Sequence, residues 1–444
     1  MNTPILDFVN RYKQSNPIRF HMPAHKGEIQ GTQMDITEID GADSLFDAKG
    51  IIDQSEKNLS ALYNTNFSVY STEGSTLAIK TMIALICAYA NDKGQRPLIL
   101  ATRNAHSSFL YGVGLLDVDV EWIIEQNACF LCSKVDEIIV EKKLKAMQVL
   151  PTALYLTCPD YLGNMLPIEK IAKVCQKYGV LLAVDNAHGA YLNFLKENLH
   201  PINLGADICS DSAHKTLPTL TGGAYLHVNK RFDYFCKDKV KKIMKVFAST
   251  SPSYLILCSL DWTNRYIYEN KDAFETCKQK VEKIKEFCLG LGFELIGQEP
   301  LKITLNCNSY GYFATEIVQM LRKENIVVEY YDKNYLVLMF SPLNTDKDYQ
   351  RLKSVLSNIE KREMITIPTF NPINLERKMS IKQALFSSEE LIDVDNAEGR
   401  ILSSINVSCP PAVPIVISGE QIDKNAISVM KYYGVEKCFV VKNK

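Results

Sequence analysis

The chain has 444 residues, of which 46% are hydrophobic and 23% are charged. This composition is typical of folded globular proteins and excludes a disordered or fibrous chain, and the length suits one large domain with one or two smaller ones. Lys and Arg total 50 against 51 Asp and Glu, so the net charge of -1 offers no overall field to attract nucleic acid or an anionic membrane.

The 13 cysteines favour free thiols over a disulfide framework. Their number is odd, and a chain of this length can bury a hydrophobic core without disulfide bonds. Free thiols indicate a reducing cytoplasm. Residues 1–20 lack the basic flank and apolar stretch of a signal peptide. The most apolar run, 81–90, is short of the roughly 20 residues that a membrane helix needs. We therefore expect a cytoplasmic protein without a membrane span.

In chain order, residues 1–55 are expected to form an amino-terminal arm, followed by a large domain over 56–290. Between 68 and 227, short apolar runs alternate with segments of helical period, which indicates an α/β fold with a mostly parallel sheet covered by helices. The run 81–90 should be a buried helix, and Leu166–Tyr178 a helix that ends before Gly179. The predicted strands are Pro97–Ala101, Ala153–Thr157, Val180–Val184, Ile208–Ser210 and Ala224–Val228.

The second half of the chain predicts smaller units. The charge-rich run Lys237–Lys245 should be a solvated helix face, and Tyr254–Leu289 a long helical connector to a small α/β domain over 291–362. A carboxyl-terminal subdomain should occupy 363–444. The elements expected in these two parts are strands at Leu301–Leu305, Ile326–Tyr331, Tyr335–Phe340, Ala412–Ile417 and Lys437–Val441, and a helix at Ala314–Lys323.

Polar side chains follow several predicted strands, where ligands of open parallel sheets bind. Gly74, Ser75 and Thr76 precede the buried helix, so that free amides and two hydroxyls would face an anion such as a phosphate. Simple helix capping is the alternative for this loop. Asp185 and Lys215 each follow a later strand, and each alone has a structural alternative, as a buried carboxylate with a cationic partner or as a solvated surface lysine.

Taken together, these groups match the requirements of pyridoxal phosphate. Lys215 lies thirty residues after Asp185, and the cofactor needs a lysine that attaches to its aldehyde and a carboxylate that keeps its ring nitrogen protonated. Such a lysine must be largely unprotonated, which desolvation and cationic neighbours favour. Ser212 and His214 flank the lysine and are expected to contact the phosphate.

Short motifs spread over nearly the whole chain carry a family resemblance. They are Phe20–Gly27, Asp43–Leu45, Gly74–Thr76, Arg103–His106, Asp185–Gly189, Ser212–Lys215, Ser249–Tyr254, Gly399–Ile401, Pro410–Pro414 and Gly419–Glu420. With these motifs the chain resembles the bacterial ornithine, lysine and arginine decarboxylases, which depend on pyridoxal phosphate and have the aspartate aminotransferase fold, also called fold type I.

The resemblance implies roles for individual residues. Lys215 would be the Schiff-base lysine, Asp185 the partner of the pyridine nitrogen, His106 would stack on the cofactor ring, and Ala187 would pack on its other face. His214 or Lys215 would return a proton to the alpha carbon. The further cofactor contacts implied are Gly74, Ser75, Thr76, His188, Ser212, His214 and Thr250. The family shares active sites between subunits, which implies at least a homodimer, with Thr250 near a neighbour's cofactor.

The chain also departs from the family pattern. Asn186 stands where a Glu is common, Ser107 where a Lys is common, Ser44 to Phe46 replace Asp-Leu-His, and Asp160 replaces a Thr. These positions are expected near the substrate. The resemblance favours decarboxylation of a basic amino acid, arginine first because compact members resemble arginine decarboxylases most often, with lysine and ornithine open. An aminotransferase, a carbon-sulfur lyase and a non-catalytic regulatory homologue are the alternatives, since one fold supports them all.

Two other motifs are weaker. Cys129 and Cys132 have the spacing of a zinc or redox pair, but no second pair follows at zinc spacing, so two thiols in a turn are favoured and no metal is expected. Gly112 and Gly114 lack the third glycine of a dinucleotide fingerprint. The sequence therefore does not predict NAD.

Overall fold

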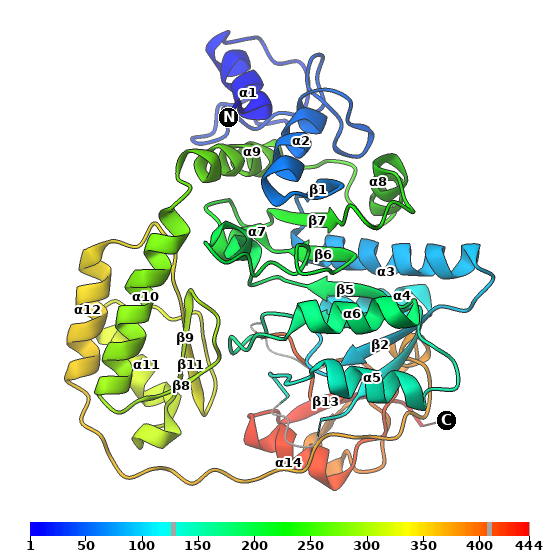
Figure 1. Ribbon diagram of the computed structural model, residues 1–444, viewed down its shortest axis with the longest axis vertical. Coiled ribbons are helices and arrows are strands. Elements are labelled where there is room, and N and C mark those ends of the chain that lie inside the picture. Colours follow the sequence, from blue (N-terminus) through cyan, green and yellow to red (C-terminus); the bar gives the residue numbers. More distant parts are fainter. Residues whose placement is uncertain (126–129, 406–410, 444) are drawn as a thin grey trace. The chain divides into compact units, whose positions relative to one another are not determined.

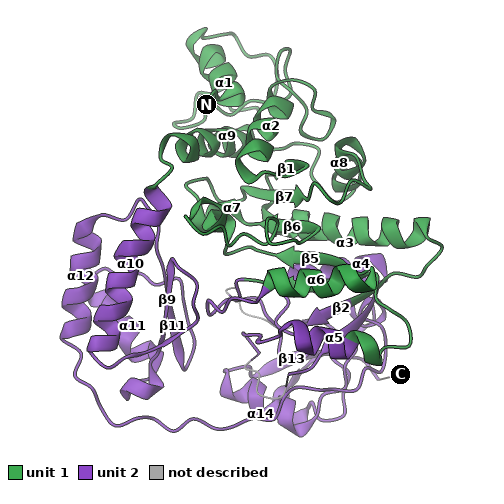
Figure 2. Ribbon diagram, in the orientation of Figure 1, with its two compact units in different colours: residues 1–99, 144–158, 168–272 green, residues 100–143, 159–167, 273–444 purple. Residues whose placement is uncertain are grey.

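The computed structural model describes residues 1–125, 130–405 and 411–443 (Figure 1). The chain divides into two compact units, shown in separate colours in Figure 2. Unit 1 comprises residues 1–99, 144–158 and 168–272, and unit 2 comprises 100–143, 159–167 and 273–444. Residues 100–143 thus group with carboxyl-terminal residues, whereas the sequence favoured one large domain over 56–290. That division into domains stays a prediction.

Unit 1 is built on five neighbouring strands in the order β1-β7-β6-β5-β4. The strands β4 (Ala153–Thr157), β5 (Leu181–Asp185) and β6 (Ile208–Asp211) are parallel. In contrast, β7 (Ala224–Val228) is antiparallel to both β6 and β1 (Phe67–Ser71). Four of the five strands therefore run in one direction and end at one edge. This confirms the expected α/β class with a mostly parallel sheet.

The helices of unit 1 follow the predicted pattern. Every residue of β1, β5 and β6 is buried, as expected for strands covered on both faces. The predicted buried helix extends from Gly74 to Asp92 as α3 and packs against β6 and β7. The predicted Leu166–Tyr178 helix is α6 (Ile168–Tyr178), and it ends before Gly179, whose φ of 67° suits glycine. The other helices are α1 (Pro4–Gln14), η1 (Leu45–Asp47), α2 (Ile51–Tyr63), η2 (Ala190–Phe194), α7 (Ala213–Thr216), α8 (Lys237–Lys245) and α9 (Tyr254–Glu269).

A carboxylate of α9 holds the start of the chain. Both Ile5 and Leu6 donate their backbone N–H groups to Asp261 Oδ2, at 2.9 and 3.0 Å, and Ser55 donates its hydroxyl to Oδ1. These amides belong to the first turn of α1, which has no partner for them within the helix. Asp261 thereby caps α1 from another helix and fixes it to α2 and α9.

The charged helix α8 is more than a solvated face. Lys241 is only 3% exposed, and its Nζ lies 2.7 Å from Oε2 of the fully buried Glu56. Lys237 Nζ lies 2.8 Å from the same oxygen, and Lys241 also donates to the carbonyl of Leu45. The prediction of a solvated helix was therefore wrong for this side of α8. The charges of α8 do not reveal that the buried carboxylate of Glu56, in α2, pairs with Lys241.

We expect Lys241→Ala to destabilise the protein strongly, by about 3 kcal/mol, because it leaves Glu56 buried with one cation fewer. The free energy of unfolding in urea measures this loss. Lys239→Ala, on an exposed position of the same helix, is the matched control and should change the free energy by less than about 0.5 kcal/mol. Equal effects of the two substitutions would contradict the importance of the buried pair.

Unit 2 contains a four-stranded antiparallel sheet in the order β10-β11-β9-β8. Helices α10 and α11 lie against this sheet, and α12 packs against these two helices (Figure 1). The elements are α10 (Ala273–Gly290), β8 (Glu294–Ile296), β9 (Lys302–Asn306), η3 (Asn308–Tyr310), α11 (Ala314–Lys323), β10 (Tyr330–Tyr331), β11 (Tyr335–Met339) and α12 (Asp346–Ser357). The predicted helix Ala314–Lys323 is confirmed, whereas only the end of the predicted strand Ile326–Tyr331 forms a strand.

The remaining elements of unit 2 come from both ends of its sequence. The segment around residues 100–143 forms the neighbouring strands β2 (Leu98–Thr102) and β3 (Asp119–Ile123) and the helices α4 (Ser107–Leu116) and α5 (Glu137–Ala146). The chain passes from one unit to the other within β2 and within α5. The carboxyl-terminal part contains α13 (Ile381–Leu385), β12 (Glu389–Asp393), η4 (Val394–Asn396), α14 (Lys424–Tyr432) and β13 (Lys437–Val441).

Two predicted elements differ from the structure. The helical run Tyr254–Leu289 is two helices, because α9 ends at Glu269 and α10 begins at Ala273. The segment 412–417 is not a strand: Pro411 and Pro414 have no N–H for a ladder, and Ala412 has a φ of 54°, far from extended backbone. The predicted strands of the large domain and Lys437–Val441 are confirmed within one or two residues.

Two further expectations concern the thiols and the membrane. The cysteines that the structure describes are all free, and most of them are buried, while Cys129 of the predicted Cys129–Cys132 turn lies outside the described residues. Within the described part of the chain, no helix combines the length and the apolar character needed to cross a bilayer.

Candidate active site

The site residues of unit 1 stand at the edge where its parallel strands end. Asp185 is the last residue of β5, and its Cα is the register partner of Ser210 on β6. Lys215 lies in α7, the short helix that follows β6, and Gly74 begins α3 just after β1. The topology thus brings the predicted carboxylate, lysine and phosphate-binding loop to one edge of a single sheet.

The carboxylate of Asp185 is buried, with 2% of the residue exposed. Tyr155 donates its hydroxyl to Oδ2 and Ala187 donates its N–H to Oδ1, both at 3.2 Å. Burial raises the pKa of Asp185 to about 6, while the charge of Lys215 and the two hydrogen bonds act in the opposite direction. Asp185 is therefore a carboxylate of high proton affinity, suited to share a proton with a cationic N–H.

A histidine lies next to the predicted Schiff-base lysine. The Nζ atom of Lys215 is 3.2 Å from Nε2 of His188. The sequence named His188 as a cofactor contact and gave it no role toward the lysine. Its place three residues after Asp185, in a turn at a strand end, is a signal that such a contact is possible, although only the fold shows that this turn faces α7.

The loop before α3 has the features of an anion cradle. Ser212 donates its hydroxyl to Ser75 Oγ at 2.7 Å, which joins the two loops predicted to surround the phosphate. The turn that ends at Gly223 approaches closely, because Gly222 accepts the N–H of Gly74 and a Cβ on Gly222 would lie 2.9 Å from the Thr72 carbonyl oxygen. Thr76 lies in the first turn of the helix, whose N-terminus favours an anion.

Two more predicted residues lie around this cradle. Ser249 donates its backbone N–H to Glu73 Oε1 at 2.8 Å, which brings the segment containing Thr250 to the start of α3. His214 is held by Gly223, whose carbonyl oxygen lies 2.9 Å from His214 Nδ1. This contact orients the imidazole on the turn, so the structure gives His214 a part in shaping the cradle.

His106 belongs to unit 2, where it forms the N-cap of α4. Its Nδ1 accepts the backbone N–H of Ser108 at 3.1 Å and lies 2.9 Å from the Ser108 hydroxyl. The unprotonated Nδ1 leaves the proton of the neutral ring on Nε2. The predicted stacking of His106 on the cofactor stays a prediction.

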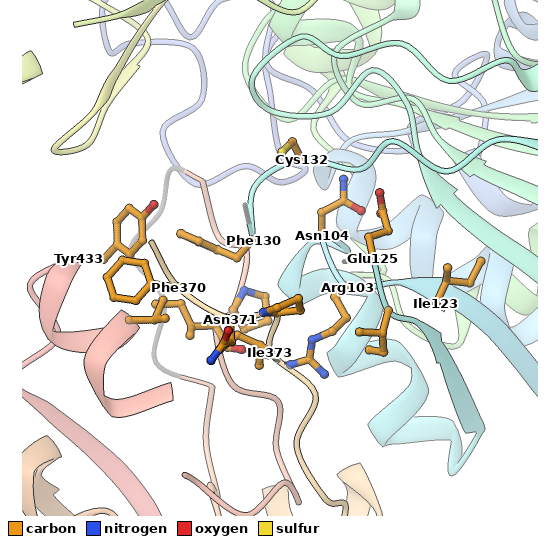
Figure 3. Close-up of a pocket in the computed structure, with 15 residues that line it drawn as sticks. Arg103, Asn104, Ile123, Glu125, Phe130, Cys132, Phe370, Asn371, Ile373 and Tyr433 are labelled. Atoms are coloured by element: carbon orange, nitrogen blue, oxygen red, sulfur yellow. Dashed lines mark hydrogen bonds between the residues drawn. The ribbon is translucent and has the colours of Figure 1, made fainter. Parts of the chain in front are cut away.

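The Arg103–His106 motif also lines a pocket of unit 2 (Figure 3). Arg103 donates from its two terminal nitrogens, Nη1 and Nη2, to Oε1 and Oε2 of the buried Glu420, at 2.5 and 3.0 Å. Figure 3 shows Phe370 and Tyr433 on one side of this pocket and Arg103 on the other. Arg103 and Glu420, two residues of separate family motifs, thus hold the end of β2 to the segment 415–420.

Two of the departures from the family pattern have structural surroundings that the sequence did not reveal. Asp160 accepts hydrogen bonds from the backbone and side chain of Asn164 and from the backbone of Ser133, so its carboxylate closes its own turn. Phe46 is buried in unit 1. The expected position of these departures near the substrate stays a prediction.

The donor set of unit 1 fits pyridoxal phosphate. The cofactor presents a phosphate, a protonated ring nitrogen and an aldehyde, and unit 1 offers in turn a helix N-terminus with hydroxyls, a buried carboxylate and a lysine. Asp185 would otherwise be a charge at the end of a buried strand with no cation in hydrogen-bonding contact among the described residues. These residues are therefore chemically matched to the cofactor.

Comparisons with known proteins identify the family of this chain. The model of the Orn/Lys/Arg decarboxylase major domain matches residues 3–289, and that of the Orn/Lys/Arg decarboxylase C-terminal domain matches residues 362–440. The arginine decarboxylase of Bacillus subtilis is 26% identical over 96% of this chain and 92% of its own length. That of Bacillus anthracis is 25% identical over 97% of this chain and 92% of its own length.

Solved structures show the same fold. The lysine decarboxylase of Francisella novicida matches with a TM-score of 0.80 at 15% identity, over 99% of this chain and 81% of its own. The constitutive lysine decarboxylase of Escherichia coli matches with a TM-score of 0.76 at 17% identity, over 99% of this chain and 82% of its own. The fold is that of the fold type I enzymes, and the family implies pyridoxal phosphate as cofactor. The chain belongs to the Orn/Lys/Arg decarboxylase family.

Proposed function

We propose that the protein decarboxylates arginine, with lysine and ornithine as weaker candidates, and that Lys215 and Asp185 are its principal catalytic residues. The observation that carries this proposal is the meeting of a buried carboxylate, a lysine with an adjacent imidazole, and an anion cradle at one sheet edge of unit 1. Arginine is favoured because the relatives from two Bacillus species that match nearly the whole chain are named arginine decarboxylases.

The residues have complementary tasks in this proposal. When bound, pyridoxal phosphate supplies the electron-accepting ring that takes up the charge left as carbon dioxide departs. Lys215 would hold the cofactor through its Nζ, and its amine would be free while a substrate amine is bound in its place. Ser75, Thr76 and Ser212 bind the phosphate, and Asp185 holds a proton at the ring nitrogen, where its high proton affinity keeps that proton from being lost.

Lys215 is the favoured donor of the proton that returns to the alpha carbon. Its amine is released when the substrate takes its place, and His188 Nε2 lies 3.2 Å from its Nζ, within reach for exchange of a proton. His214 is less suited, because its Nδ1 faces the Gly223 carbonyl. We assign to His188 the task of exchanging a proton with Lys215.

We further propose a homodimer, or a higher homo-oligomer, in a reducing cytoplasm. The amino-terminal segment supports this assembly because Ile18, Phe20 and Met22 are 84%, 95% and 66% exposed, and apolar side chains so far exposed commonly mark a surface for association. The free described cysteines support the reducing compartment. Light scattering should give at least twice the 50.2 kDa of one chain, whereas the mass of a single chain would contradict the assembly.

The test of the proposed function offers arginine, lysine and ornithine separately to the purified protein loaded with pyridoxal phosphate. We expect carbon dioxide and the product amine in equal amounts, with kcat/KM highest for arginine. Preference for another basic amino acid would change only the substrate assignment. Bound cofactor without carbon dioxide from any of the three would overturn decarboxylation and favour the aminotransferase or lyase alternatives.

A further inference from the structure

A buried cluster of ionisable side chains lies at the same end of the sheet as the candidate active site, and its side chains point away from that site. Successive residues of a strand point to opposite faces. Asp185 and Ser212 contact the active-site groups Tyr155 and Ser75. Their neighbours Asn186 and Asp211 point the other way, where they meet His200 and His227. All four residues of this cluster, which we call the Asp211 cluster, are 0% exposed.

Asp211 is the centre of the cluster and accepts hydrogen bonds on both oxygens. His200 Nε2 and His227 Nε2 lie 2.8 and 3.2 Å from Oδ2. Asn186 donates from Nδ2 to Oδ1 at 2.8 Å, and its Nδ2 lies 3.0 Å from His200 Nε2. The amide hydrogens directed at the carboxylate would repel a cation, so hydrogen bonding accounts for the cluster better than a metal ion.

Each imidazole presents its Nε2 to Asp211. His200 Nδ1 accepts the backbone N–H of Ile202 at 3.2 Å, so this nitrogen carries no proton and the ring donates through Nε2. Burial lowers the pKa of His227, more than the nearby Asp211 raises it, and its Nδ1 lies 2.7 Å from the Ser68 hydroxyl. The Nε2–H of each ring is therefore available to Asp211.

The other titratable groups that face Asp211 are neutral. They are Tyr63 on α2, Tyr225 on β7 and Cys209 on β6, and burial raises the pKa of each above its ordinary value. Burial also acts to raise the pKa of Asp211, but the electrostatic interactions with His200 and His227, together with the hydrogen bonds from both rings, outweigh it and lower that pKa. Among the described residues, no Lys or Arg forms an ion pair with Asp211. The cluster thus carries one buried negative charge.

We propose that Asp211 is a positioning residue for the cofactor site, whose buried negative charge strengthens the hold of Asp185 on the proton of the cofactor's ring nitrogen. The charge acts through the sheet, because Asp211 follows Ser210, the register partner of Asp185. A buried negative charge on the neighbouring strand attracts the proton that Asp185 and the ring nitrogen share. It therefore opposes the loss of that proton. The charge of Asp211 also acts to raise the pKa of Asp185 in the protein without the cofactor.

The cluster also ties together the two chain segments that bear the catalytic groups. Asn186 directly follows Asp185, and Asp211 directly precedes Ser212 and the turn to Lys215. The Asn186–Asp211 hydrogen bond therefore joins these segments at their ends, while His227 adds β7 to the same anchor. The inference rests on cofactor binding as proposed above, and it extends that proposal to residues that do not touch the cofactor.

The test is a pH titration of the absorbance of bound pyridoxal phosphate. Asp211→Asn removes the charge with little change in shape. We expect the pH at the midpoint of the absorbance change to fall by about one unit. The double variant Asn186→Asp with Asp211→Asn exchanges acid and amide, so it keeps one charge in the cluster and should return the midpoint to the wild-type value or above. Asp207→Asn is the matched control, since it removes a carboxylate just before β6, at the other end of the strand, and should leave the midpoint unchanged.

The outcomes separate charge from folding. An unchanged midpoint in a folded Asp211→Asn protein overturns the inference. A lowered midpoint in the double variant also overturns it, and this second measurement decides the matter if the single variant does not fold. A shift in the Asp207→Asn control as large as that of Asp211→Asn would also overturn it. Because the readout is absorbance, a protein that binds the cofactor without releasing carbon dioxide fails the proposed function and still tests this inference. A wild-type protein that binds no cofactor would overturn both.

Discussion

Lys215→Ala is expected to lower the rate of carbon dioxide release by at least about 10⁴-fold, because the substitution removes both the group that holds the cofactor and the favoured proton donor. The same variant should still take up some pyridoxal phosphate through Ser75, Thr76 and Ser212, but no longer covalently. Mass spectrometry after borohydride reduction measures this attachment directly, and it should be found on Lys215 in the unchanged protein and on no residue of the variant.

Lys215→Arg is the matched comparison for this experiment. Arginine keeps a positive charge near Asp185 and His188, but its guanidinium does not lose a proton at neutral pH and cannot attach to the aldehyde. We expect it to be as inactive as Lys215→Ala while unfolding closer to the wild-type temperature. Activity within about 10-fold of wild type in either variant would show that another residue does the chemistry.

Asp185→Asn is expected to have the second largest effect, a fall in kcat of about 10³-fold. The amide cannot carry the negative charge that keeps the ring nitrogen protonated, and without that proton the ring is a weaker electron acceptor. Tyr155 and the Ala187 amide would still approach residue 185, so the fold should survive. Steady-state kinetics for kcat, and a fluorescence titration for the dissociation constant of the cofactor, measure the two parts of the loss.

Two comparisons sharpen this second prediction. Asp185→Glu keeps the charge but moves it, and should recover part of the lost kcat. Tyr155→Phe removes one hydrogen bond from Asp185 Oδ2 and should cost much less than Asp185→Asn, because the charge is untouched. If Asp185→Asn kept more than a tenth of the wild-type kcat, the assignment of Asp185 to the ring nitrogen would be wrong.

The strands and the edge residues of the sheet were predictable because their signals are local. Short apolar runs ended by polar residues predicted β4 through β7, and the polar residues at those ends indicated where a ligand binds. In contrast, the sequence of α8 gave no indication that Lys241 is buried, since its partner Glu56 lies far away along the chain. A pairing of this kind depends on tertiary packing, which no pattern within one helix contains.

The limits of prediction at the site have the same origin. The motifs named His188, yet its contact with Lys215 depends on how the turn after β5 faces α7. The Asp211 cluster was missed altogether, because His200, Asp211 and His227 come from three separate segments and none belongs to a recognisable spacing. Asp160 is a further example, because its hydrogen bonds with Asn164 in a turn were not predicted from the sequence.

The cap that Asp261 places on α1 has a practical consequence for handling the protein. Thr3, Pro4 and Ile5 are buried, and the amides of Ile5 and Leu6 are both donors to Oδ2 of Asp261. Trimming the first six residues, whether by design or by a protease, would remove both of these donors from a buried carboxylate. Variants that lack these residues should therefore be less stable and precipitate more readily.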